Sequence, residues 1–182
     1  MIQAKRIATD EDLYRVEEKA ELVNGEIVIM SPASIGHGRK SSKIYISLLE
    51  YEQRTGRGCA VSDNVGFIVD LPNRQSFSPD AAYYFGLVEE DEFIDGAPDF
   101  AADVRSTEDF GPRAEAALAA KRADYFAAGT KVVADVDMIR DKVIRVYRAN
   151  KPNEPTIYAA SEIAGAEPSV PGWTMAVAEL LK

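Results

Sequence analysis

The chain has 182 residues, 46% of them hydrophobic, and carries a formal net charge of −9 at pH 7. A chain of this length typically forms one domain and buries a core without help from disulfides or a structural metal. The single cysteine, Cys59, excludes an internal disulfide, and together with the single histidine, His37, it is too little for a structural zinc centre.

No stretch of the sequence is long and apolar enough to cross a membrane, and the first residues lack the apolar segment of a signal peptide. We therefore expect residues 1–182 to form one domain in the reducing cytoplasm. The negative charge opposes indiscriminate binding to nucleic acid, which depends on lysine and arginine. The charge is uneven, because residues 37–58 hold five bases and two acids, and residues 140–151 hold five bases and one acid. Such runs are also typical of solvated surfaces.

The first third of the chain predicts a helix, a hairpin and a long helix. Thr9, followed by Glu11 and Asp12, is typical of a helix start, and this helix should end near residue 19. Asn24-Gly25 between two apolar runs predicts a β-hairpin. A long helix is expected over residues 34–55, where apolar side chains recur every three or four positions.

The rest of the chain predicts mainly strands, around a second helix over residues 112–128 that ends at Gly129. The main strands are expected over residues 59–71, 78–85, 99–105, 130–139 and 142–148. An acidic loop precedes the third of these strands, and short strands broken by prolines complete the chain. This order predicts an α/β fold with a central mixed sheet flanked by helices, preceded by the first helix and the hairpin.

Two aspartates lie within the expected apolar strands. Alternate residues of a strand share a face, so Asp103 shares a face with Ala101 and Arg105. A buried carboxylate needs a partner, and two that converge repel unless a cation or a shared proton lies between them. A hard cation such as Mg²⁺ prefers oxygen ligands of this kind. The alternatives are that Asp80 and Asp103 end their strands in solvent, or that one of them pairs with Arg105.

A lysine lies in the apolar stripe of the second main helix. At about 100° per residue, Lys121 falls within the arc that Ala114, Leu118 and Tyr125 form. Lysine is rare in such a stripe unless it is paired, although its stem can also lie along the edge of a core. If its ammonium reaches the carboxylates, it can orient an attacking water or stabilise charge on a phosphoryl group.

Six short segments are informative together through their order and spacing. They are residues 21–26 (ELVNGE), Met30-Ser31-Pro32 with His37, Ser78-Pro79-Asp80, Asp103-Val104-Arg105-Ser106, residues 121–126 (KRADYF) with Gly129, and residues 170–173 (VPGW). The chain resembles, over nearly its whole length, the Uma-two family of restriction-endonuclease-like proteins, which belongs to the PD-(D/E)XK nuclease superfamily. The resemblance implies a restriction-endonuclease-like fold.

The resemblance also implies a metal site for Mg²⁺, with Mn²⁺ as its substitute. Asp80 matches the first metal ligand, Asp103 the second, and the backbone carbonyl of Val104 would be a further ligand. Lys121 matches a catalytic lysine that has moved to the helix from the position that Arg105 occupies here.

Further positions match the family with less defined roles. Glu21 matches a recurrent acid and is counted among the catalytic candidates. His37, at the start of the long helix, could contact a phosphate or orient an acid. His37, Arg39, Lys40 and Arg105 are the candidates for contacts with nucleic acid.

One position departs from the family pattern, because Asp103 stands where the family usually has glutamate. The shorter side chain requires the strand to approach the metal more closely, or a water to intervene. Arg105 on the same face could also pair with Asp103 and compete with the metal. The alternative to an active nuclease is therefore a catalytically weakened or inactive protein of the same fold that serves as a binding or oligomeric module.

The resulting prediction is a divalent-metal-dependent endonuclease that hydrolyses DNA phosphodiester bonds. DNA is its expected partner, and no membrane is involved. A homo-oligomer, with a dimer favoured, is expected by resemblance, because such nucleases often pair their active sites to cut two strands.

Overall fold

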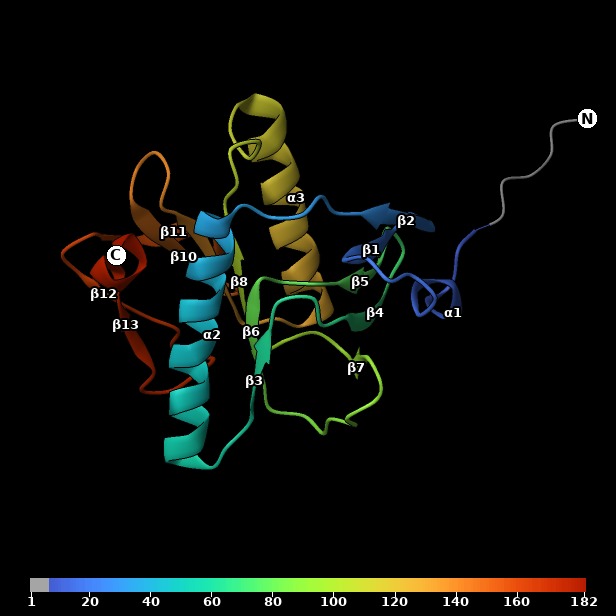
Figure 1. Ribbon diagram of the computed structural model, residues 1–182, viewed down its shortest axis with the longest axis horizontal. Helices are drawn as coiled ribbons and strands as arrows, with labels where there is room; N and C mark the ends of the chain where they lie inside the picture. The colour runs from blue at the N-terminus through green and yellow to red at the C-terminus, as the bar shows by residue number, and fades with distance from the viewer. Residues whose placement is uncertain (1–6) are drawn as a thin grey trace, which may run out of the picture.

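The strands form a six-stranded sheet, a five-stranded sheet and a two-stranded ribbon in the computed structural model, which describes residues 7–182 (Figure 1). The six-stranded sheet has the order β11-β10-β9-β8-β6-β3 and is antiparallel except between β8 and β9. Its strands are β3 (Cys59–Ser62), β6 (Ala81–Tyr84), β8 (Phe100–Val104), β9 (Val132–Asp137), β10 (Val143–Arg148) and β11 (Lys151–Ala159).

The five-stranded sheet has the order β2-β1-β5-β4-β7 and contains the predicted hairpin at its edge. Its strands are β1 (Ala20–Val23), β2 (Glu26–Ile29), β4 (Phe67–Leu71), β5 (Arg74–Phe77) and β7 (Ile94–Asp95). The ribbon near the C-terminus consists of β12 (Ile163–Gly165) and β13 (Thr174–Ala176).

Two long helices lie on opposite faces of the six-stranded sheet. The helices are α1 (Asp10–Leu13), α2 (Ile35–Thr55) and α3 (Pro112–Ala128), followed by a 3-10 helix, η1 (Val177–Leu181). Ile44 and Leu48 of α2 pack into one apolar cluster with β8 and β9. Tyr125 of α3 packs into a second cluster, together with Phe77 of the five-stranded sheet. The six-stranded sheet is therefore covered by α2 on one face and by α3 and the other sheet on the second (Figure 1).

The alternation of β8 determines where its aspartate lies. Phe100, Ala102 and Val104 belong to the α2 cluster, whereas Ala101 belongs to the α3 cluster. Because Asp103 shares the face of Ala101, it lies between the sheet and α3. This agrees with the face predicted from the sequence.

The predicted α/β fold with a mixed sheet is confirmed, but several of its elements differ from the prediction. The first helix ends at Leu13 instead of near residue 19, because only Leu13 is buried and a longer helix would have no apolar face to pack. The strand expected over residues 59–71 is divided into β3 and β4 by a turn at Asn64, whose φ is +65°. The short β5 was not predicted, because its sequence RQSF contains three polar residues and gives no apolar pattern.

Candidate active site

Four aspartates lie in a row across four neighbouring strands of the six-stranded sheet. Asp103 of β8 pairs in register with Asp135 of β9. Ala81 of β6 pairs with Ala102 of β8, so Asp80 lies beside Asp103, one position further along. Ser62 of β3 pairs with Ala81 of β6, so Asp63 lies beside Asp80. We call these four residues the carboxylate row. Like charges on adjacent strands destabilise a sheet, so the row requires cations or protons.

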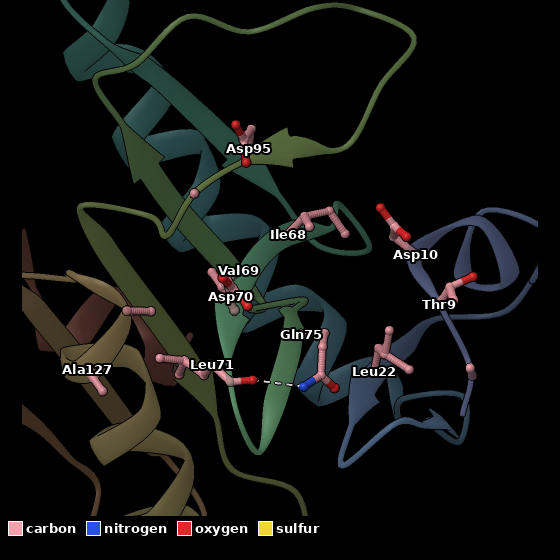
Figure 2. Close-up of a pocket in the computed structure, with 13 residues that line it drawn as sticks. Thr9, Asp10, Leu22, Ile68, Val69, Asp70, Leu71, Gln75, Asp95 and Ala127 are labelled. Carbon is pink, nitrogen blue, oxygen red and sulfur yellow. Dashed lines mark hydrogen bonds between the residues drawn. The ribbon is translucent and has the colours of Figure 1, made fainter. Parts of the chain in front are cut away.

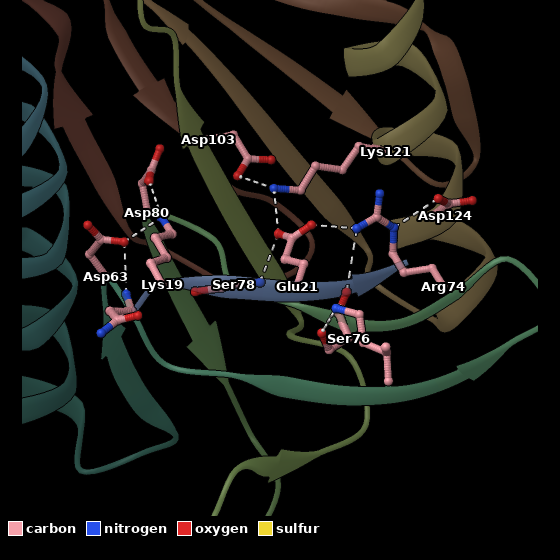
Figure 3. Close-up of polar contacts among 12 residues, drawn as sticks. Lys19, Glu21, Asp63, Arg74, Ser76, Ser78, Asp80, Asp103, Lys121 and Asp124 are labelled. Atoms are coloured by element: carbon pink, nitrogen blue, oxygen red, sulfur yellow. Dashed lines mark hydrogen bonds and ion pairs between the residues drawn. The ribbon is translucent and has the colours of Figure 1, made fainter. Parts of the chain in front are cut away.

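Asp80 receives donors on both of its carboxylate oxygens, and Figure 3 shows the one from Lys19. Its Oδ1 lies 2.7 Å from Nζ of Lys19, and its Oδ2 accepts the backbone N–H of Val104 at 2.7 Å. Nε2 of His37 lies 3.2 Å from the same Oδ2. Burial by itself would raise the pKa of Asp80, but the hydrogen bond from His37 and the charge of Lys19 hold that pKa well below its usual range. Asp80 in turn raises the pKa of His37.

Asp103 shares its lysine with Glu21 of β1. Nζ of Lys121 lies 3.2 Å from Oδ1 of Asp103 and 3.0 Å from Oε1 of Glu21. Burial, together with the charges of Asp80 and Glu21, raises the pKa of Asp103 to about 6, although Lys121 opposes this rise. Burial would lower the pKa of Lys121, but the two carboxylates hold it well above its usual value. Lys121 therefore remains an ammonium between them.

Glu21 is fixed from both ends of β5. Nη1 of Arg74 lies 2.5 Å from its Oε2, and the backbone N–H of Ser78 donates to its Oε1 at 3.0 Å (Figure 3). Arg74 also binds Asp124 of α3 at 3.0 Å. Burial would raise the pKa of Glu21, whose side chain is 5% exposed, but the charges of Lys121 and Arg74 lower it. The five-stranded sheet is thereby connected to α3 beside the carboxylate row.

The donor set available for a divalent cation consists of Asp80, Asp103 and the backbone carbonyl of Val104. Mg²⁺ is usually held by one or two carboxylates and keeps several waters, so these residues fit it. Burial and the charges of Asp80 and Glu21 raise the pKa of Asp103, so a bound cation would stabilise its ionised form. Among residues 7–182 no group of three or more His, Cys, Asp or Glu side chains has the geometry of a metal site. An ion here would therefore keep water or substrate oxygens among its ligands.

A family model establishes the relationship of the chain to known proteins. The Uma2 model, described as "Putative restriction endonuclease", matches residues 10–178. The chain belongs to the Uma2 family. This confirms the relationship predicted from the sequence.

The fold of this Uma2 protein is similar to a crystal structure from Anabaena variabilis, described as a "putative nuclease belonging to DUF820". The TM-score is 0.73 at 15% sequence identity, and the match covers 94% of this chain and 96% of that one. No curated protein matches the sequence. None of the helices within residues 7–182 has the length and apolar character needed to span a membrane.

Arg105 does not pair with Asp103, so the alternative in which it competes with a metal for that carboxylate is wrong. Its Nε and Nη2 bind the two oxygens of Asp135, each at 2.6 Å, and Nη1 contacts Glu115 of α3. The bidentate geometry suits guanidinium and carboxylate. The Arg105 side chain is 6% exposed and faces protein carboxylates, so it fixes the start of α3 instead of presenting charge to solvent.

The remaining candidates for nucleic-acid contacts lie on α2. His37 is at the start of the helix against Asp80, whereas Arg39 is exposed. Lys40 donates to the backbone carbonyl of Gly36 at 3.1 Å. Within residues 7–182, neither Arg39 nor Lys40 forms a hydrogen bond or ion pair with the carboxylate row.

A pocket of about 570 Å³, drawn in Figure 2, has none of the carboxylate row, Glu21, Lys19 or Lys121 in its described lining. Leu22, the neighbour of Glu21, lines it, and neighbouring residues of a strand point to opposite faces. Its described lining includes Asp10, Asp70 and Asp95 and contains no lysine or arginine. Because such a pocket repels phosphates, we assign it no part in the chemistry of the carboxylate row.

Sequence reasoning missed four residues of the site: Lys19, Asp63, Arg74 and Asp135. All four are partners across sheet registers and connections that the sequence does not reveal. One signal was present, because Lys19 lies two positions before Glu21 and residues at this spacing share a face when the strand is extended.

Proposed function

We propose that this Uma2 protein is an endonuclease that hydrolyses DNA phosphodiester bonds with Mg²⁺, for which Mn²⁺ is a substitute. The observation that carries the proposal is the position of four predicted residues: Lys121 bridges Asp103 and Glu21, and Asp80 lies beside Asp103 on the neighbouring strand. Burying three acids and a lysine together is costly to folding. Such clusters with shifted pKa values are typical of functional sites.

Asp80, Asp103 and the carbonyl of Val104 would hold the cation. When bound, it would lower the pKa of a coordinated water and offset charge on the scissile phosphate. Asp80 is ready for this role, because the N–H of Val104 and His37 already orient its Oδ2. Asp103 must be deprotonated to bind a metal, and its pKa of about 6 makes this the pH-sensitive ligand.

Lys121 would orient the attacking water or stabilise negative charge that develops on the phosphate. Its ammonium is held by Asp103 and Glu21, so the charge is in place before substrate arrives. Glu21 acts on Lys121 as a positioning residue, and Arg74 fixes Glu21.

DNA would be bound through its phosphates, by a protein dimer in the cytoplasm. Exposed Arg39 and the start of α2 at His37 would contact backbone phosphates, which makes binding salt-sensitive. A homodimer would bring two sites to the two strands of a duplex. A cytoplasmic location suits both this substrate and the free thiol of Cys59. Light scattering coupled to size exclusion tests the dimer.

One observation favours a second candidate, a non-catalytic binding module. Both oxygens of Asp80 are engaged by protein donors, Oδ1 by Lys19 and Oδ2 by Val104 and His37. These donors compensate the buried charge of Asp80 without a metal, as a purely structural role would require.

The two candidates differ in metal binding and cleavage. Calorimetric titration with Mn²⁺ and incubation with single- and double-stranded DNA in millimolar Mg²⁺ or Mn²⁺ separate them, with Asp80→Asn as the control. A nuclease binds the ion and cuts DNA, and the control does neither. A wild-type protein that neither binds Mn²⁺ nor cuts either substrate contradicts the nuclease proposal.

A further inference from the structure

Asp63 and Asp80 form a pair of carboxylates on the edge side of the carboxylate row. They follow β3 and precede β6, at the position next to the last paired residues of those antiparallel strands. The turn after β3 orients Asp63, because its Oδ1 accepts the backbone N–H of Asn64 at 2.8 Å. Two acids that face each other on adjacent strands repel.

Lys19 lies between these two carboxylates. Its Nζ is 2.5 Å from Oδ1 of Asp63 and 2.7 Å from Oδ1 of Asp80 (Figure 3). The lysine side chain is 20% exposed, and it reaches the pair from the residue immediately before β1. The start of β1 therefore contributes to both lysine bridges. Lys19 supplies the cation for Asp63 and Asp80, and Glu21 supplies an acid for Lys121.

Asp80 is consequently shared by two cation positions. One is the Lys19 ammonium on its Oδ1, and the other is the proposed metal position between Asp80 and Asp103. Two-metal phosphodiester enzymes have the same plan, in which neighbouring cations about 3.5–4 Å apart clamp the reacting phosphate. Here the ammonium of Lys19 lies between Asp80 and Asp63, on the opposite side of Asp80 from the proposed metal position.

We propose that Lys19 is a built-in second cation of the active site, which fills the position between Asp63 and Asp80 so that the chain takes up a single divalent ion. The inference rests on the proposed function for the first ion, at Asp80 and Asp103. Lys19 is a positioning residue for Asp80, and it supplies as a fixed charge what a second metal would otherwise supply.

The test counts Mn²⁺ ions bound per chain by electron paramagnetic resonance of the free ion. Wild type and Lys19→Arg, which keeps the charge, should each bind one ion. Lys19→Ala should bind two, and adding Asp63→Asn to Lys19→Ala should return the count to one. Lys131→Ala is the matched control, because Lys131 binds the single carboxylate of Asp99 at 2.6 Å and its loss should add no ion.

A Lys19→Ala variant whose count equals that of wild type overturns the inference, and it leaves the proposed function intact if both bind one. In another outcome the wild type binds no ion, Lys19→Ala binds one, and adding Asp63→Asn removes it again. This outcome supports Lys19 as the occupant of a cation position and contradicts the metal-dependent nuclease. If Lys19→Ala unfolds without metal, thermal unfolding with Mn²⁺ decides: an increase in Tm larger than that of wild type supports the gained site. No larger increase overturns it.

Discussion

Lys19 and Lys121 each bridge two carboxylates, but the two bridges differ in the other donors that their carboxylates receive. Asp80, beside Lys19, also accepts bonds from Val104 and His37, and its pKa is lowered. Asp103, beside Lys121, shares its one lysine with Glu21, and its pKa is raised to about 6. The pKa values of these two neighbouring aspartates are thus shifted in opposite directions, and Asp103 is the one that additional positive charge would stabilise.

This difference indicates how the site would work. Asp80 is oriented and ionised before any ion arrives, whereas Asp103 gains most from the ion's charge. On the Lys19 side, both oxygens of Asp80 already have donors. On the Lys121 side, we expect Asp103 to accept a further cation. Substitutions on one side or the other should therefore have different effects on metal binding, catalysis and stability.

The largest effect is expected from Asp80→Asn, which removes the anionic ligand common to both sides. Its amide oxygen still accepts the N–H of Val104, so the fold should persist. We expect Mn²⁺ binding to be lost in calorimetry and DNA cleavage to fall by about 10³-fold or more, since metal activation and phosphate clamping both depend on the ion. Wild-type cleavage rates in this variant would contradict the assignment of Asp80.

Lys121→Met should affect catalysis more than metal binding. The isosteric change removes the charge that stabilises the transition state, so we expect kcat to fall by about 10²–10³-fold. Glu21 and Asp103 lose their shared cation, so the free energy of unfolding should fall as well. Single-turnover kinetics at saturating Mn²⁺ separate the two effects. An equal loss of Mn²⁺ affinity and rate would show that Lys121 only maintains the ligands.

Arg105→Met tests whether a charged residue that binds Asp135 of the carboxylate row contributes to stability and not to metal binding. The substitution leaves Asp135 buried without its bidentate partner, so we expect the free energy of unfolding to fall by about 3 kcal/mol. The Mn²⁺ affinity of the folded fraction should not change, because Arg105 does not touch Asp103. Urea denaturation and calorimetry measure these quantities. A marked change in metal affinity would indicate that the two halves of the row are coupled.

The pH dependence of metal binding should identify Asp103. Its pKa is raised to about 6, so below that pH a proton occupies the carboxyl that the ion requires. The Mn²⁺ affinity should therefore rise about tenfold per pH unit as pH increases toward 6. Above pH 6 this contribution levels off, because Asp103 is then already ionised. Asp103→Asn should lose the dependence below pH 6; the same slope in that variant would assign it elsewhere.

Much of this site could be predicted from local patterns. The alternation of β8 placed Asp103 on the face of Ala101, and the helical stripe of α3 identified Lys121 as a lysine among apolar residues. These inferences needed only the geometry of one strand and one helix.

The partners of these residues could not be predicted in the same way. Lys19 is 44 residues from Asp63 and 61 residues from Asp80 along the chain, and only the pairing of strands brings the three together. Arg105 was one candidate partner for Asp103, because alternate residues of an extended chain share a face and Arg105 lies two positions after Asp103. In the structure it binds Asp135 instead, because β9 offers a carboxylate in register whose two oxygens match the guanidinium.

The most direct test of the metal site is a crystal of the wild-type protein soaked in Mn²⁺ and measured for anomalous scattering. We expect a peak within bonding distance of the carboxylates of Asp80 and Asp103 and the carbonyl of Val104, with Lys19 still seated between Asp63 and Asp80. Fully soaked crystals without a peak at Asp80 and Asp103, or with Mn²⁺ only at other carboxylates, would contradict the assignment of these residues as the metal ligands.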